Sequence, residues 1–338
     1  MALWDSGRNS LLRRRPGKGT VFHDLAEGRH DLSGMYRNRV NSSMKKIRLT
    51  LQLIYTILTN GYAFGFLSGK IYQGKLKYVC VPGLNCYSCP GALASCPMGA
   101  LQALFNQNGY HIPFAVLGFF FFFGSLLGRF LCGWMCPFGL IQDLLHKIPL
   151  FRKKKRLPFH HILKYGKYAV LIFLVCAGSL FLFGGFARIP AFCKFLCPSG
   201  TLIGALPLLL TNKLLRSQVG GLFFWKLGIL TVILLLSIKI YRPFCQYLCP
   251  LGAIYGWFNR FSLVQIRWEK ERCISCMRCQ NACPVGLPVN EISRSPECIR
   301  CGHCTEACPE KCLTFSVKSW PSQHASKQRT KTARSVRL

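Results

Sequence analysis

The feature that most constrains this chain is a pair of cysteine runs near its C-terminal end. One run reads CISCMRCQNACP from position 273, and the other reads CIRCGHCTEACP from position 298. Each is Cys-x2-Cys-x2-Cys-x3-Cys-Pro, a spacing that binds paired [4Fe–4S] clusters. Three cysteines on one tight loop reach three corners of a cubane, and the distant Cys-Pro of the other run closes the fourth. The spacing therefore predicts two clusters, one held by Cys273, Cys276, Cys279 and Cys308 and one by Cys283, Cys298, Cys301 and Cys304.

A pair of zinc ribbons is the alternative interpretation of these cysteines. A structural zinc site takes its thiolates from two Cys-x2-Cys pairs. Here each run carries four cysteines and ends in Cys-Pro. The pattern favours iron–sulfur ligation, and we interpret residues 265–317 as a small α+β ferredoxin-like domain with two clusters.

The rest of the chain has the composition of a membrane protein. Of its 338 residues, 51% are hydrophobic and only 16% are charged, which lies on the membrane side of the soluble average. Four apolar stretches have about the length that crosses a bilayer as a helix, and they cover residues 47–67, 113–131, 168–187 and 222–240. Asn60 and Gly61 interrupt the first stretch. We therefore expect a mainly α membrane protein whose four-span domain covers residues 47–264.

A shorter apolar run lies between the third and fourth of these stretches. It covers residues 202–210 and contains Pro207. Because it is too short to cross a bilayer, it predicts an interfacial or re-entrant helix.

The distribution of basic residues predicts the orientation in the membrane. The 44 Lys and Arg residues outnumber the 11 Asp and Glu residues, but they lie in blocks beside the apolar stretches, so a membrane topology is favoured over nucleic-acid binding. Residues 1–48 contain 11 Lys and Arg and residues 129–167 contain 9, against 3 in 70–112 and 4 in 188–221. The two basic segments are thus expected in the cytoplasm, with both termini on that side of a multi-pass cytoplasmic-membrane protein.

Two terminal segments are expected to lie outside the folded domains. Residues 1–46 form a basic tail, and MKKIRLTLQLIY from Met44 reads like a bacterial N-terminus that continues into a span, so the preceding residues are interpreted as an upstream extension. Residues 318–338 are polar and basic. They are expected to be disordered, either solvated or lying on anionic lipid.

Further Cys-Pro motifs recur through the membrane domain. They read CGWMCPFGLI (132–141), CKFLCPSGTLI (193–203) and CQYLCPLGAI (245–254), with a looser version CYSCPGALASCPMGAL (86–101). The chain therefore repeats a unit of span, cysteine motif, span and cysteine motif, which predicts two repeats packed about an axis along the membrane normal. Pro at the first helical position starts a helix, so each Cys-Pro cysteine is expected at a helix N-terminus, whose free N–H groups face an anionic cluster.

Two pairs of Cys-x3-Cys motifs supply the ligands for two more clusters. On the cytoplasmic side the four thiols are Cys132, Cys136, Cys245 and Cys249. On the outer side Cys193 and Cys197 are expected to pair with two of Cys80, Cys86, Cys89 and Cys96. Cys96 matches Cys197, but the position expected for its partner holds Ala92, so the choice among these four stays open. A cluster held by these four alone, and helix capping by small buried thiols without any cluster, also stay open.

At these motifs the chain resembles the NapH/NosR-type membrane polyferredoxins, over about residues 45–315. The match rests on Cys132 with Cys136, on Cys245 with Cys249, and on the eight cysteines of the two C-terminal runs. The resemblance implies a protein that passes electrons between a cytoplasmic donor or a quinol pool and a redox partner, often across the membrane. The outer motifs, from position 80 to 96 and at Cys193 and Cys197, depart from the simplest members and leave the partner undefined.

The sequence therefore predicts an electron-transfer component of an oxidoreductase system, without bond-making chemistry of its own. Basic residues around the ferredoxin-like motifs are expected to dock an acidic donor such as a soluble ferredoxin or flavodoxin, unless they are only solvated charge; they are Arg272, Arg278, Arg294 and Arg300. Two other functions stay open. One is an accessory protein that reduces a metal or a disulfide during maturation of another enzyme, using a spare thiol pair among the outer cysteines. The other is a scaffold whose clusters only stabilise the fold.

Overall fold

The computed structural model describes residues 44–105, 114–150, 153–177, 190–292 and 294–317. The chain divides into two units, Met1–Ser43 and Met44–Leu338, and all described residues belong to the second. The C-terminal tail, most of the N-terminal tail and the second half of the predicted span 168–187 therefore lie outside the described residues.

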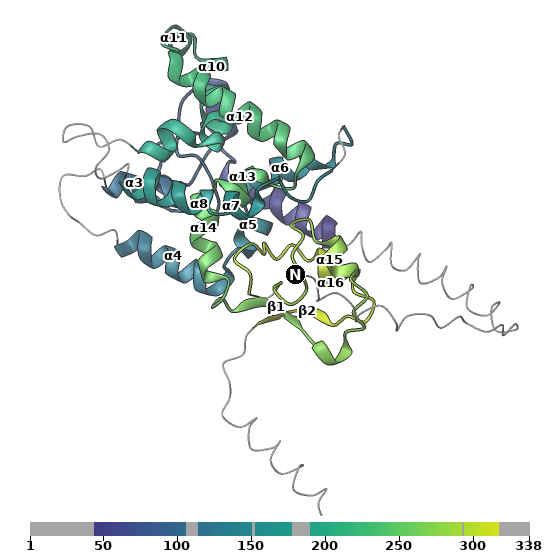
Figure 1. Cartoon of the computed structure of the whole chain (residues 1–338). Coiled ribbons are helices and arrows are strands. Elements are labelled where there is room, and N and C mark those ends of the chain that lie inside the picture. The colour runs from purple at the N-terminus through teal and green to yellow at the C-terminus, as the bar shows by residue number, and fades with distance from the viewer. Residues whose placement is uncertain (1–43, 106–113, 151–152, 178–189, 293, 318–338) are drawn as a thin grey trace, which may run out of the picture. The chain divides into compact units, whose positions relative to one another are not determined.

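The described residues are mainly helical (Figure 1). Residues 44–59 form a first, unlabelled helix. The elements in chain order are α2 (Ala63–Ser68), η1 (Lys75–Tyr78), α3 (Pro97–Phe105), α4 (Phe114–Leu127), α5 (Phe130–Trp134), α6 (Pro137–Lys147), α7 (His160–Leu163), α8 (Gly166–Ala169), η2 (Val170–Ala177), η3 (Phe192–Leu196), η4 (Gly200–Ala205), α10 (Leu206–Thr211), α11 (Lys213–Ser217), α12 (Gly221–Lys239), α13 (Pro243–Tyr247), α14 (Pro250–Phe258), β1 (Val264–Trp268), η5 (Lys270–Arg272), α15 (Arg278–Ala282), α16 (His303–Ala307) and β2 (Leu313–Val317).

Helix α12 is the one helix of the described residues that is long and apolar enough to cross a membrane. It corresponds to the predicted span 222–240. Helix α4 and the segment Gly200–Thr211 are apolar but shorter, and the four-span arrangement stays a prediction.

Two of the expected spans end earlier than predicted, for identifiable reasons. The first helix stops at Asn60, whose side-chain amide donates hydrogen bonds to the Thr56 carbonyl at 3.2 Å and the Thr59 hydroxyl at 3.1 Å. The predicted interruption at this position is confirmed. Helix α4 ends at Gly128, which has φ +53°, and the next backbone N–H, of Arg129, donates to the Asn259 side chain at 2.9 Å. The predicted span 113–131 is thereby divided between α4 and α5.

The C-terminal cysteine runs lie between two antiparallel strands. Strand β1 pairs with β2 from Val264 opposite Val317 to Trp268 opposite Leu313, and each run continues into one short helix, α15 or α16. Ser275 and Arg300, which occupy the same position in their runs, have φ of 53° and 51°. The two runs thus repeat the same left-handed turn, a conformation that points successive N–H groups into one concavity and is common at iron–sulfur sites.

The second cysteine run packs directly against the helical core. The Trp134 indole N–H of α5 donates to the Arg300 carbonyl at 2.9 Å, and the Asn259 amide donates to the Cys298 carbonyl at 2.7 Å. A Cβ added to Gly133 would lie 2.3 Å from the Ile299 carbonyl oxygen, so the close approach of α5 to this run requires glycine. The ferredoxin-like segment and the core are therefore one packed structure and not two domains on a linker.

Candidate metal centres

The Cys-Pro cysteines lie at helix N-termini, as the motif predicts. Cys136 and Cys249 are the N-cap residues of α6 and α14, with proline directly after each. Their sulfur atoms accept hydrogen bonds from the backbone N–H groups of Gly139 and Gly252, both at 3.4 Å. Cys197 accepts the equivalent bond from the Gly200 N–H at 3.4 Å. Each sulfur therefore faces the donor end of a helix, which stabilises a thiolate.

Four thiols from two halves of the chain form an inner quartet: Cys132, Cys136, Cys245 and Cys249. All four are buried. In every pair among them, the charge of one thiolate raises the pKa of the other thiol. Burial raises the pKa of Cys132 to about 11 and that of Cys245 to about 12, because desolvation penalises a thiolate. Thiols in such a place give up their protons on coordinating a metal. The structure brings together the four residues that the sequence predicted for this site.

An outer quartet is formed by Cys86, Cys96, Cys193 and Cys197. Again every pair interacts electrostatically. The Cys86 sulfur also lies 3.4 Å from the Cβ position of Gly200, which follows Cys197 in its motif. The structure therefore selects Cys86 and Cys96 from the four candidates that the sequence left open.

The two remaining outer cysteines lie beside this quartet. Cys89 is buried, and among the thiols Cys86 acts on it most strongly. Burial raises the pKa of the Cys80 thiol, and a hydrogen bond with Ser95 lowers it. The sequence placed Cys86, Cys89 and Cys96 among the cluster-binding candidates; the geometry groups Cys86 and Cys96 with Cys193 and Cys197, and a ligand role for Cys89 stays a prediction.

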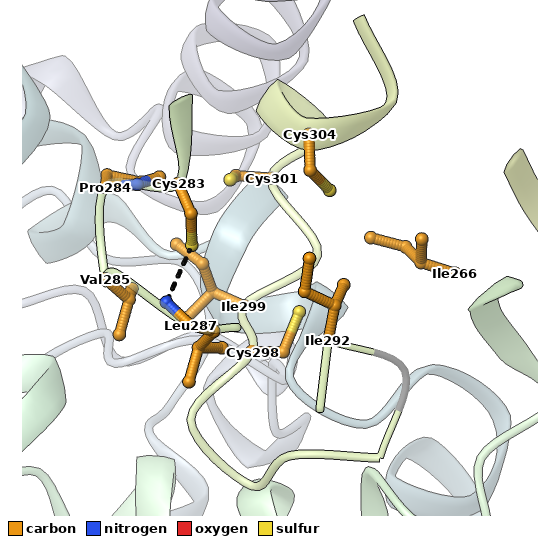
Figure 2. Close-up of a pocket in the computed structure, with 10 residues that line it drawn as sticks. All are labelled: Ile266, Cys283, Pro284, Val285, Leu287, Ile292, Cys298, Ile299, Cys301 and Cys304. Carbon is orange, nitrogen blue, oxygen red and sulfur yellow. Dashed lines mark hydrogen bonds between the residues drawn. The ribbon is translucent and has the colours of Figure 1, made fainter. Parts of the chain in front are cut away.

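The second C-terminal run closes a third quartet with a cysteine of the first. Figure 2 shows the sulfur atoms of Cys283, Cys298, Cys301 and Cys304 around one apolar cavity. All pairs among these four interact electrostatically, and the Leu287 N–H donates to the Cys283 sulfur at 3.4 Å. The crossed assignment, in which Cys283 joins the later run, agrees with this arrangement.

The fourth predicted site is closer to the surface. Burial and the charges of Cys308 and Cys276 raise the pKa of Cys279. Cys276 is exposed. Cys312 contacts two predicted ligands of this site: its sulfur lies 3.2 Å from that of Cys308, and its thiol also interacts with that of Cys273. Ile274 and Met277, in the same run, are 62% and 52% exposed. This site thus presents an apolar and basic face to solvent.

Buried charge supports anionic groups at these sites. Among the described residues, six basic side chains are buried, Arg48, Lys77, Arg129, Lys167, Arg242 and Arg300, against two acidic ones, Asp143 and Glu297. An unbalanced buried charge is costly. Clusters held by four thiolates are anionic, so the excess of buried cations fits the binding of [4Fe–4S] clusters in the quartets. No three His, Cys, Asp or Glu side chains in the described ranges lie close enough to hold a single metal ion.

Two fully buried arginines connect the inner quartet to the second C-terminal run. Arg129 donates to the Cys245 carbonyl at 2.8 Å, to the Pro296 carbonyl at 2.6 Å and to the Glu297 carboxylate at 3.1 Å. Arg242 donates to the Cys132 carbonyl and forms an ion pair with Asp143, and its charge also acts on Cys301. Lys167 completes the Glu297 ion pair.

Sequence reasoning missed these buried cations or assigned them other roles. Arg129 and Lys167 contributed to the basic count of a cytoplasmic loop. Arg300 was predicted as part of a docking surface, and that prediction is wrong: its guanidinium is 1% exposed and donates to the Leu127 and Asn259 carbonyls. The other three predicted docking arginines are exposed. In the sequence, the position of Arg300 inside a cysteine run was the one signal that could have indicated its burial.

Comparison with known proteins agrees with this chemistry. A family described as a 4Fe-4S binding domain matches residues 108–158, 169–215 and 222–271, and a second family of the same description matches residues 265–288. No solved structure matches the chain.

Three relatives illustrate the range of similarity. An uncharacterized protein of Methanocaldococcus jannaschii is 35% identical over 175 residues, which are 49% of this chain and 63% of the relative. The ferredoxin-type protein NapH of Haemophilus influenzae is 26% identical over 261 residues, 74% of this chain and 76% of the relative. The regulatory protein NosR of Stutzerimonas stutzeri is 30% identical over 165 residues, 46% of this chain and 20% of the relative. The chain thus spans less than two thirds of the first and third of these proteins.

Proposed function

Because this chain belongs to the NapH/NosR-type polyferredoxins and binds [4Fe–4S] clusters, we propose that it is a membrane-bound electron-transfer protein with four such clusters. Each bound cluster supplies reversible one-electron transfer. Two belong to the ferredoxin-like segment, one to the inner quartet and one to the outer quartet. The chain relays electrons between a cytoplasmic donor or a quinol and a partner on the outer side of the membrane.

The observation that carries this proposal is the continuity of the sites. The exposed site around Cys276 lies next to the Cys283 quartet, because the two runs exchange their last ligands. Arg129 bonds to the Cys245 carbonyl and to Pro296 and Glu297, which directly precede the second run, and the charge of Arg242 acts on both Cys245 and Cys301. The buried core around the inner quartet also contains Cys96 and Cys197 of the outer quartet. The four inner thiols are buried, as are Cys96 and Cys197 of the outer quartet.

The surface supports a membrane location. Helix α12 carries large apolar side chains that are more than half exposed: Phe224, Trp225, Val232 and Leu235. Such a surface on a long apolar helix is expected to face lipid.

Contacts between the basic loop and the ferredoxin-like segment support the proposed orientation. Lys155 donates to the Asn281 carbonyl at 2.8 Å, and Arg156 donates to the Val285 carbonyl at 3.2 Å. Both belong to the basic segment 129–167, which is expected in the cytoplasm. The ferredoxin-like segment therefore lies on the same side of the membrane as this loop.

A cavity between the first helix, α6 and η4 suits a quinol headgroup. Its volume is about 200 Å³, and it is lined by Thr56, Asn60, Phe66, Cys89, Pro137, Leu140, Ile141 and Ile203. A cavity of roughly 150 Å³ admits a six-membered ring. The side-chain oxygen Oδ1 of Asn60 is buried without a partner among the described residues, so it is available to accept a hydrogen bond from a quinol hydroxyl.

The relay is tested in proteoliposomes that enclose oxidised cytochrome c. Reduced flavodoxin, which does not cross the bilayer, is added outside to vesicles in which the ferredoxin-like segment faces outward. We expect the wild-type protein to reduce the enclosed cytochrome c. In vesicles with Cys249→Ala, reduction is expected to be as slow as in empty vesicles, because the inner site loses a ligand. A quinol analogue replaces flavodoxin in a parallel experiment. Equal rates for Cys249→Ala and the wild type, with both donors, contradict the relay.

A further inference from the structure

Tyr255 is a buried polar residue whose hydroxyl has no hydrogen-bond partner among the described residues. The side chain has an exposed fraction of 0%. A buried donor without an acceptor destabilises the folded state, so a group that accepts its hydrogen bond is expected beside it.

The surroundings of Tyr255 indicate what that group is. The residue lies on α14, the helix that begins at the inner ligand Cys249, and its ring packs edge-to-face on Phe120 of α4 with the centroids 6.1 Å apart. Among the thiols, Cys132 of the inner quartet has the largest electrostatic effect on Tyr255, followed by Cys96 of the outer quartet. Tyr255 therefore lies between the two sites.

A second buried hydroxyl approaches the same region. Tyr55, on the first helix, interacts with Cys136 of the inner quartet and with Tyr255, and its hydroxyl also finds no acceptor among the described residues. A phenol keeps its proton at neutral pH and donates it to an anionic acceptor. The cysteine thiolates of a bound cluster are such acceptors.

We propose that Tyr255 is a positioning residue that donates its hydroxyl hydrogen bond to the anionic cluster held by the inner quartet and so sets the reduction potential of the inner site. Hydrogen bonds to the sulfur ligands are one determinant of that potential. The bond stabilises the reduced state more than the oxidised one, because reduction adds negative charge to the acceptor. The inference rests on the proposed function, since it requires a cluster in the inner quartet.

The test is the variant Tyr255→Phe in anaerobic redox titrations followed by EPR, with the inner signal identified by its loss in Cys249→Ala. We expect unchanged iron and sulfide content and a more negative midpoint potential of the inner signal. The signals of the ferredoxin-like segment stay in place. The matched control is Tyr247→Phe, because the Tyr247 hydroxyl bonds to His160 at 3.0 Å and accepts from the Leu157 N–H at 3.3 Å, and it forms no hydrogen bond with a cysteine of the described residues. The control is expected to leave the inner potential where it is.

An inner potential that is unchanged in Tyr255→Phe overturns the inference while leaving the proposed function intact. A wild-type protein without an inner signal overturns the proposed function itself. If Tyr255→Phe loses iron, the deciding protein is one with a ring-fluorinated tyrosine at position 255, a stronger donor of nearly the same shape. Its inner potential is expected to become more positive, and a potential equal to that of the wild type overturns the inference.

Discussion

Replacing Cys86 with alanine is expected to remove one of the proposed four clusters, so that iron falls by about a quarter. Cys86 interacts with all three other thiols of the outer quartet. Three thiolates leave one iron without its cysteine ligand, and a site of this kind takes four. Iron, sulfide and the EPR signals of the anaerobically purified variant measure the loss.

The matched control is Cys89→Ala, three residues away in the same loop. Cys89 is the more buried of the two, so burial alone would favour it as a ligand. We expect Cys89→Ala to keep the full iron content. Loss of iron in Cys89→Ala with retention in Cys86→Ala would reverse the assignment of the outer ligands.

Replacing Arg242 with leucine is expected to destabilise the protein by about 3–5 kcal/mol, the usual cost of breaking a buried ion pair. The substitution leaves Asp143 with Arg48 alone and removes the donors to the Cys132 and Gly133 carbonyls. In detergent the first-order rate at which cluster absorbance is lost on warming measures the effect. A rise of roughly 100-fold or more is expected if the destabilisation appears in the unfolding rate.

The control for this substitution is Arg272→Leu. Arg272 pairs with Glu269 at 3.5 Å, but its side chain is 65% exposed, and an exposed pair contributes about 0–1 kcal/mol. The control should lose its absorbance at nearly the wild-type rate. If Arg242→Leu behaves like Arg272→Leu, the buried cations do not hold the inner site together.

The cysteine chemistry could be predicted from the sequence because ligand spacing is local. The crossed ligands of the two C-terminal runs, the helix starts after Cys136 and Cys249, and the inner quartet all follow from motif spacing and chain order. The interruption of the first helix at Asn60 also follows from local residue type. The helix starts and the interruption depend on a few neighbouring residues, whereas the inner quartet and the crossed ligands follow from the repetition of the motifs along the chain.

Other parts of the site depend on packing that the sequence does not display. The choice of Cys86 could not be made from the repeat, because the corresponding position holds Ala92. Arg129 and Arg300 look like surface charge until their buried acceptors are known. Tyr255 is one aromatic residue in an apolar helix, and only its neighbours distinguish it. The predicted span 113–131 is longer than helix α4, because apolar composition does not show that Gly128 ends the helix.

Iron and sulfide analysis with low-temperature EPR decides whether the three quartets and the exposed site each hold a cluster. For the anaerobically purified wild-type protein we expect about 16 iron and about 16 sulfide atoms per chain, with signals from four interacting cubanes. About 8 of each, with signals from the ferredoxin-like segment alone, would contradict it, because the inner and outer quartets would then be buried thiols that carry no electrons.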